Sequence, residues 1–198
     1  MKKIYLGLIS LFLLVIATAC SVTEHTESKG RIDNIDQLKL QKTDVMITDD
    51  KKLVGEMTVS DGKNTNKQIV PTDLYYIFTI KNTSNNDISL PGVEKVNLRI
   101  EPDKDLLSVA KETIGKNIYD VDESGLGFGL SMDNEIPSKK TSKFTLNYKL
   151  GAKQKNDELP LLPAKEKLKK LQANALKGTL IISQDGKDVA RFRLDTNE

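Results

Sequence analysis

The fold is decided by residues 74–82, which read Leu74-Tyr75-Tyr76-Ile77-Phe78-Thr79-Ile80-Lys81-Asn82. Large side chains recur here with the period of two that is typical of a β-strand, so that Tyr76, Phe78 and Ile80 share one face. The residues between them are also mostly apolar. Because a strand with two apolar faces is usually covered on both sides, this pattern predicts a central strand.

Shorter segments with a similar alternation lie on both sides of this strand along the chain. We expect further strands at residues 38–48, 53–60, 68–70, 88–90, 95–101, 127–132, 141–150, 179–184 and 188–195. The last two would form a hairpin around residues 185–187, where Asp-Gly is a frequent turn pair.

Two segments have the spacing of a helix. Residues 103–115 predict either a short helix or an irregular crossover, and residues 163–176 predict a helix that Pro163 begins and Gly178 caps. No β-helix-β period repeats along the chain. We therefore predict a mainly-β protein, an antiparallel two-sheet sandwich with a short helix before the C-terminal hairpin, formed as a single domain by residues 37–198.

Two stretches of this predicted sandwich carry a resemblance. Residues 75–84 read YYIFTIKNTS, and residues 135–146 read EIPSKKTSKFTL. Both are similar to stretches of the immunoglobulin-like domains found in small bacterial surface lipoproteins, and the similarity extends over about residues 38–150. The resemblance implies an immunoglobulin-like fold and a location outside the cell, and it implies no particular activity.

The start of the chain has the layout of an export signal. Met1-Lys2-Lys3 is followed by an uncharged, mostly apolar run over residues 4–16 and then by Ala17-Thr18-Ala19-Cys20. Because Cys20 is the only cysteine, it cannot form an intramolecular disulfide. The stretch resembles a bacterial lipoprotein signal, which implies that residues 1–19 are removed between Ala19 and Cys20 and that Cys20 carries the lipid.

Two other interpretations of this leader remain open. The small residues Ala17 and Ala19 also fit ordinary signal cleavage, which would leave a free thiol on Cys20 in a secreted protein. An uncleaved membrane anchor is disfavoured, since the apolar run is shorter than the roughly 20 residues that span a bilayer. Residues 20–36 are polar and lack an apolar period, which predicts a flexible tether between anchor and domain.

The charge of the chain argues against some partners. The formal net charge of +2 comes entirely from Lys2 and Lys3 of the leader, so the mature chain is neutral and offers no electrostatic reason to bind nucleic acid. A lysine-rich and asparagine-rich composition favours a Gram-positive bacterium. We thus expect a lipid-anchored protein on the extracytoplasmic face of the cell membrane.

Charge is distributed unevenly along this neutral chain. Residues 101–135 are predominantly acidic, whereas residues 151–177 are predominantly basic. The basic stretch could meet anionic lipid or a wall polymer, or it could be the solvated face of a helix. Its centre holds Lys165, Lys167, Lys169 and Lys170.

One acidic segment has part of a calcium-binding pattern. Asp120, Asp122 and Ser124, followed by Gly125, match the opening positions of a calcium loop. The twelfth position, which should be glutamate, is Ser131. The segment therefore predicts either a weak calcium site or a solvated acidic turn.

No spacing in the sequence predicts a nucleophile with its base, and His25, the only histidine, lies in the expected tether. We therefore expect a non-enzymatic binding or interaction module without a cofactor, held to the membrane by the lipid on Cys20. Its partner would be a cell-envelope protein or a wall polymer. The alternative is a lipoprotein that binds calcium or another small ligand.

Overall fold

The computed structural model describes residues 35–60, 66–90 and 95–196. The predicted signal peptide, its cleavage position between Ala19 and Cys20, the lipidation of Cys20 and nearly all of the expected tether lie outside the described residues. The first described element is η1 (Ile35–Gln37), a short 3-10 helix that leads into the first strand.

Seven strands form two antiparallel sheets. The larger sheet has the order β1-β4-β9-β7, and the smaller sheet has the order β11-β10-β6. The strands of the larger sheet are β1 (Leu38–Thr48), β4 (Thr72–Asn82), β9 (Thr141–Gly151) and β7 (Phe128–Ser131). The strands of the smaller sheet are β6 (Val96–Pro102), β10 (Gly178–Gln184) and β11 (Lys187–Arg193).

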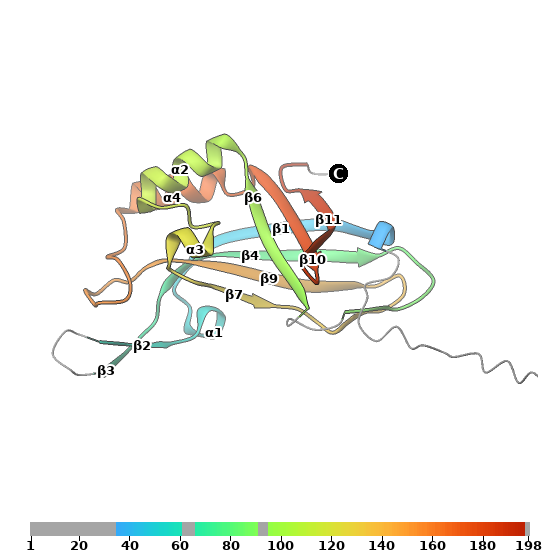
Figure 1. The fold of residues 1–198 in the computed structure, drawn as a ribbon, viewed down its shortest axis with the longest axis horizontal. Coiled ribbons are helices and arrows are strands. Elements are labelled where there is room, and N and C mark those ends of the chain that lie inside the picture. The colour runs from blue at the N-terminus through green and yellow to red at the C-terminus, as the bar shows by residue number, and fades with distance from the viewer. Residues whose placement is uncertain (1–34, 61–65, 91–94, 197–198) are drawn as a thin grey trace, which may run out of the picture.

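This strand order is that of an immunoglobulin constant-type domain. If β1, β4, β6, β7, β9, β10 and β11 are lettered A to G in chain order, the sheets become A-B-E-D and G-F-C. That pairing defines the constant-type sandwich. In Figure 1 the smaller sheet crosses in front of the larger one, with β6 running diagonally over β4, β9 and β7. The predicted mainly-β, immunoglobulin-like class is confirmed.

The remaining elements are inserted into the connections between these strands. The β1–β4 connection holds α1 (Lys51–Val54) and the hairpin of β2 (Met57–Ser60) and β3 (Asn66–Ile69). The β6–β7 connection holds α2 (Lys104–Ile114) and α3 (Val121–Ser124), and the β9–β10 connection holds α4 (Lys165–Asn174). A small pair is formed by β5 (Ile88–Ser89) and β8 (Glu135–Ile136).

Helices α2 and α4 pack side by side at one end of the molecule, while η1 lies at the other end of the long axis (Figure 1). The ambiguous segment 103–115 is a helix: Asp103 accepts a hydrogen bond from Leu106 N at 2.9 Å, and Gly115 ends the helix with φ 81°. Leu171 of α4 is fully buried and joins the main core, so α4 packs on the sandwich.

Three details of the sequence prediction are wrong. Pro163 does not begin α4, which starts at Lys165 after the N-cap residue Ala164. Residues 53–60 do not form one strand, because Asp50 accepts a hydrogen bond from Lys52 N and begins α1. Gly178 does not cap α4, whose C-cap is Ala175; it is the first residue of β10. A Cβ at position 178 would lie 2.9 Å from Glu101 O, so glycine is needed there to let β10 approach β6.

Tyrosines connect the layers of the core. Tyr76 of β4 donates a hydrogen bond to Ala175 O at 3.0 Å, and its hydroxyl lies 3.0 Å from that of Tyr119. Tyr148 of β9 accepts a hydrogen bond from Ile100 N of β6 at 3.1 Å, which joins the two sheets directly. Burial raises the pKa of all three hydroxyls, so they stay protonated and act as hydrogen-bonding groups.

Candidate functional site: a groove beside strand β6

A groove with a volume of about 470 Å³ runs along the free edge of β6, between this strand, α3 and the start of β7. Among the described strands, β6 pairs only with β10 and β7 only with β9, so each forms an edge of its sheet. The groove therefore opens where the two sheets of the sandwich are both unpaired. It is lined by residues 97–102 and 119–122, with Phe128 and Tyr148.

Alternation along β6 gives the groove one apolar and one polar side. Leu98 and Ile100 point into the core and are almost completely buried. Asn97 and Glu101 are exposed, and Arg99 is half-buried. This is the pattern of a strand that covers a core with one face and meets solvent with the other.

The edge of β6 presents few donors to the groove. The amide of Ile100 points away from β10 and is occupied by the hydroxyl of Tyr148. Because every second residue of an antiparallel strand faces the same side, the polar backbone groups of Leu98 and Pro102 also face the groove. Pro102 has no amide hydrogen. Over residues 98–102 this leaves the Leu98 amide as the free donor, beside the carbonyls of Leu98 and Ile100.

The arginine next to the groove is already paired. Arg99 donates to the two carboxylate oxygens of Asp188 at 2.9 and 3.0 Å and to Ser183 Oγ at 2.9 Å. The hydrogen bond from Arg99 lowers the pKa of Asp188, and Asp188 raises the pKa of Arg99. Arg191 bridges Asp188 and Glu101, so these four side chains neutralise one another.

The side of the groove that faces β6, formed by the start of α3, is acidic. Asp120 precedes α3 and accepts a hydrogen bond from Glu123 N at 2.9 Å, so its carboxylate caps this short helix. Asp122 is exposed and forms no ion pair with another described residue. Neither carboxylate has a cationic partner within the part of the chain that the structure describes. The groove therefore carries a net negative charge.

An aromatic ring stands at the mouth of the groove. Phe128 lies opposite Tyr148 in the β7–β9 pair, so it faces the interior side of its sheet, yet 39% of its surface is exposed. The reason is its place at the end of an edge strand, where none of the strands that the structure describes covers it. Most phenylalanines in this pattern would be core residues, and residue 128 is an exception that the sequence does not reveal.

The predicted calcium residues are separated by the structure. Asp120 and Asp122 line the groove, whereas Ser124 is 1% exposed and donates to Val121 O within α3. Across the described ranges, no three side chains of His, Cys, Asp or Glu are grouped so that they could hold a metal ion. The loop begins with a capped helical turn, and the two aspartates remain available to another kind of ligand.

The basic stretch of the sequence is partly neutralised. Lys170 of α4 pairs with Glu112 of α2 at 2.6 Å, and Lys167 donates to Glu112 O at 3.2 Å. The hydrogen bond from Lys170 lowers the pKa of Glu112. Lys165 and Lys169 are exposed without an ion pair among the described residues. The stretch is mainly a solvated helix face that α2 partly balances.

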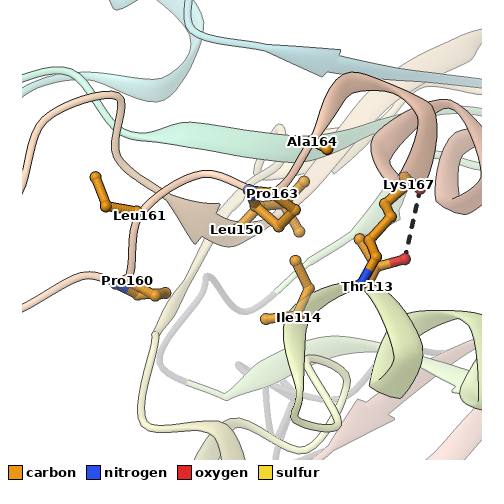
Figure 2. A pocket seen from close by; sticks show the side chains of 8 residues that line it. All are labelled: Thr113, Ile114, Leu150, Pro160, Leu161, Pro163, Ala164 and Lys167. Atoms are coloured by element: carbon orange, nitrogen blue, oxygen red, sulfur yellow. Dashed lines mark hydrogen bonds between the residues drawn. The ribbon is translucent and has the colours of Figure 1, made fainter.

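A second hollow lies at the α2–α4 end of the molecule and has a volume of about 330 Å³ (Figure 2). Its walls are apolar except for Lys167 and Thr113, whose hydroxyl donates to Lys167 O at 3.4 Å. Leu161 on its rim is 59% exposed. The apolar walls comprise Ile114, Leu150, Pro160, Leu161, Pro163 and Ala164. Unlike the groove, this pocket does not lie at the edge of a described sheet, and no carboxylate lines it.

Comparison of the chain with protein-family models, with curated proteins and with solved structures finds no match. None of the helices described has both the length and the apolar character needed to cross a bilayer.

Proposed function

We propose that this protein is a lipid-anchored, extracytoplasmic binding module, which acts without catalysis and receives a cell-envelope partner in the groove beside β6. The observation that carries the binding role is an exposed aromatic ring, Phe128, at a groove between two unpaired sheet edges. Exposed aromatic rings and strand edges are features that proteins use for recognition.

The anchoring part of this proposal is supported by the leader. A basic start, an apolar run and Ala17-Thr18-Ala19-Cys20 suit export followed by acylation of Cys20. The immunoglobulin-like fold agrees with the resemblance to surface lipoproteins, and such sandwiches serve as scaffolds for many binding functions.

The chemistry of the groove suits recognition. Its polar groups are carboxylates, backbone carbonyls, the side-chain amide of Asn97 and an arginine that is paired with Asp188 and Ser183. Tyr119 and Tyr148 reach the groove with buried rings, and their hydroxyls are bonded to Tyr76 and to the Ile100 amide. These groups can accept hydrogen bonds and provide apolar contact to a partner.

The anchor is tested by the intact mass of the protein from its native membrane fraction, beside a Cys20→Ser variant. We expect a diacyl or triacyl mass on Cys20 in the membrane fraction, and release of the variant. An unmodified Cys20 in the medium would contradict the anchor and would make the protein a secreted factor.

The binding role is tested by a photo-crosslinking amino acid at Asn97, an exposed position of the groove, in intact cells. We expect a discrete crosslinked product that disappears when Phe128→Ala is added. The same group at Glu166, on α4 and away from the groove, is the control. Equal crosslinking from both positions, or none from Asn97, would contradict a partner in the groove.

A further inference from the structure

The groove has an unbalanced set of hydrogen-bonding groups. Along residues 98–102 the edge of β6 offers the carbonyls of Leu98 and Ile100 but only one free amide, because Tyr148 occupies one donor and Pro102 lacks one. The α3 side of the groove adds the carboxylates of Asp120 and Asp122. A ligand that satisfies these groups must itself be rich in donors.

The charge of the groove favours a ligand that is positively charged. Arg99 and Arg191 are paired with Asp188 and Glu101, so they neither attract an anion nor neutralise the aspartates of α3. Asp122 is exposed without a cationic partner among the residues the structure describes. A positively charged ligand therefore gains attraction here, and an acidic ligand is repelled.

Phe128 adds a contact that favours a cation. An ammonium or guanidinium group over the face of an aromatic ring is attracted by its quadrupole. Phe128 is exposed on the same groove as Asp120 and Asp122. A long basic side chain can place its apolar stem along the ring and its charged end beside the carboxylates.

The shape of the site favours an extended backbone. The groove follows β6 over residues 97–102, which is the length of a short strand. Carbonyls along a strand edge accept hydrogen bonds from the amides of a second extended chain, with a spacing that a compact ligand does not reproduce.

We propose that the groove receives an extended peptide segment rich in lysine or arginine, supplied by a partner protein. Peptide amides donate to the carbonyls of Leu98 and Ile100, and basic side chains lie across Phe128 toward Asp120 and Asp122. This inference rests on the proposed binding role of the groove and identifies the class of its ligand.

The test uses the full-length protein in detergent and fluorophore-labelled hexapeptides, with binding followed by fluorescence anisotropy. The basic peptide alternates lysine with valine, and the acidic peptide alternates glutamate with valine. We expect the basic peptide to bind at least about tenfold more tightly, and its affinity to fall as the salt concentration rises. Equal affinity for the two peptides would overturn the proposal.

Variants locate the binding on the protein. Asp122→Asn should weaken the basic peptide roughly three- to fivefold, and Phe128→Ala about fivefold or more. Glu166→Gln removes the same charge from α4, outside the residues that line the groove, and should change affinity less than about twofold. Circular dichroism melting confirms that each variant is folded. Equal losses in Asp122→Asn and Glu166→Gln would overturn the assignment to the groove.

Two further ligands test whether the groove recognises a peptide backbone or only a positive charge. A basic peptide with N-methylated amides cannot donate to the edge of β6, and we expect it to bind at least about fivefold more weakly. Spermine carries charge without a peptide backbone and should compete poorly. If spermine displaces the peptide at equal charge concentration, or N-methylation has no effect, the extended-peptide proposal is wrong.

The peptide experiment and the crosslinking experiment together distinguish a wrong ligand class from the absence of any binding role for the groove. If the peptides fail while crosslinking from Asn97 still depends on Phe128, the ligand class is wrong and the binding groove remains. If both experiments fail, the groove has no binding role.

Discussion

At the scale of single residues, Asp73 stands out because its carboxyl group is buried outside the main core. Asp73 is 0% exposed, and its Oδ1 has no hydrogen-bond partner among the described residues. Asn147 donates to Oδ2, and Lys149 lies near enough to influence the carboxyl group. Burial nevertheless raises the pKa of Asp73, against the opposing effects of Asn147 and Lys149.

The raised pKa predicts a specific dependence of stability on pH. An acid with a higher pKa in the folded state holds its proton more tightly there, so it destabilises the fold as pH rises above the unfolded value of 3.8. We expect the stability of Asp73→Asn relative to wild type to improve between about pH 4 and neutral pH. Urea unfolding at several pH values measures this, and a constant difference would contradict it.

Residue by residue, the sequence was informative wherever burial follows from alternation. Tyr76, Phe78 and Ile80 are completely buried, as their common face predicts. Phe128 follows the same pattern and is exposed, because exposure at a sheet edge depends on what lies beside the strand. Alternation specifies a face, whereas the order of strands in the sheet decides whether that face is covered.

At the scale of elements, the groove lies between the edges of the two sheets, and each edge is partly protected against pairing with another chain. An unprotected strand edge can pair with another chain. Strand β6 is protected by Pro102 and by the hydroxyl of Tyr148, which occupies the Ile100 amide. Strand β7 is protected by its short length of 4 residues. Part of the β6 edge thus remains unpaired among the described strands.

The hydroxyl of Tyr148 gives a prediction at this scale. Tyr148→Phe keeps the buried ring but leaves the Ile100 amide without its acceptor, which should cost about 1–2 kcal/mol of unfolding free energy. It also adds a free donor to the edge, so we expect more self-association in size-exclusion chromatography.

Tyr75→Phe is the matched control, since Tyr75 is buried and its hydroxyl has no hydrogen bond within the described residues. Similar losses of stability in the two variants would show that the hydroxyl of Tyr148 does not support the sheet edge.

The positions of the elements were only partly predictable. The principal strands and the helix before the last hairpin follow from periodicity, but α1 and α3 have 4 residues each and are too short to show a period. Both depend on an aspartate that caps the first turn, Asp50 and Asp120. Asp120 has the residue type expected of a calcium ligand, and its capping role appears only in three dimensions.

At the scale of the whole molecule, one core connects both sheets with the helical end. The main cluster of buried side chains includes Phe78 and Phe144 of the larger sheet, Leu180 of the smaller sheet, Leu106 of α2 and Leu171 of α4. Because these groups share one core, we expect the domain to unfold as a single cooperative unit.

Cooperativity can be measured with Leu171→Ala. Removing this buried side chain should lower the unfolding free energy by about 2–4 kcal/mol, and it should shift the whole urea transition. Far-ultraviolet circular dichroism and tyrosine fluorescence should report the same midpoint, because Tyr76 bonds the residue at the end of α4. A separate early transition for the helical signal would instead show that α2 and α4 unfold independently.

The route by which the chain enters the domain has a mechanical consequence. Strand β1 starts at the η1 end, runs toward the α2–α4 end, and pairs with β4 from Leu38 to Thr48 (Figure 1). If the protein is held at its N-terminal side and a partner pulls toward the α2–α4 end, tension runs along the axis of β1. The hydrogen bonds between β1 and β4 then bear the load in parallel, in shear, and do not open one after another from one end. In this arrangement the β1–β4 pairing resists a force that is applied along the axis of β1.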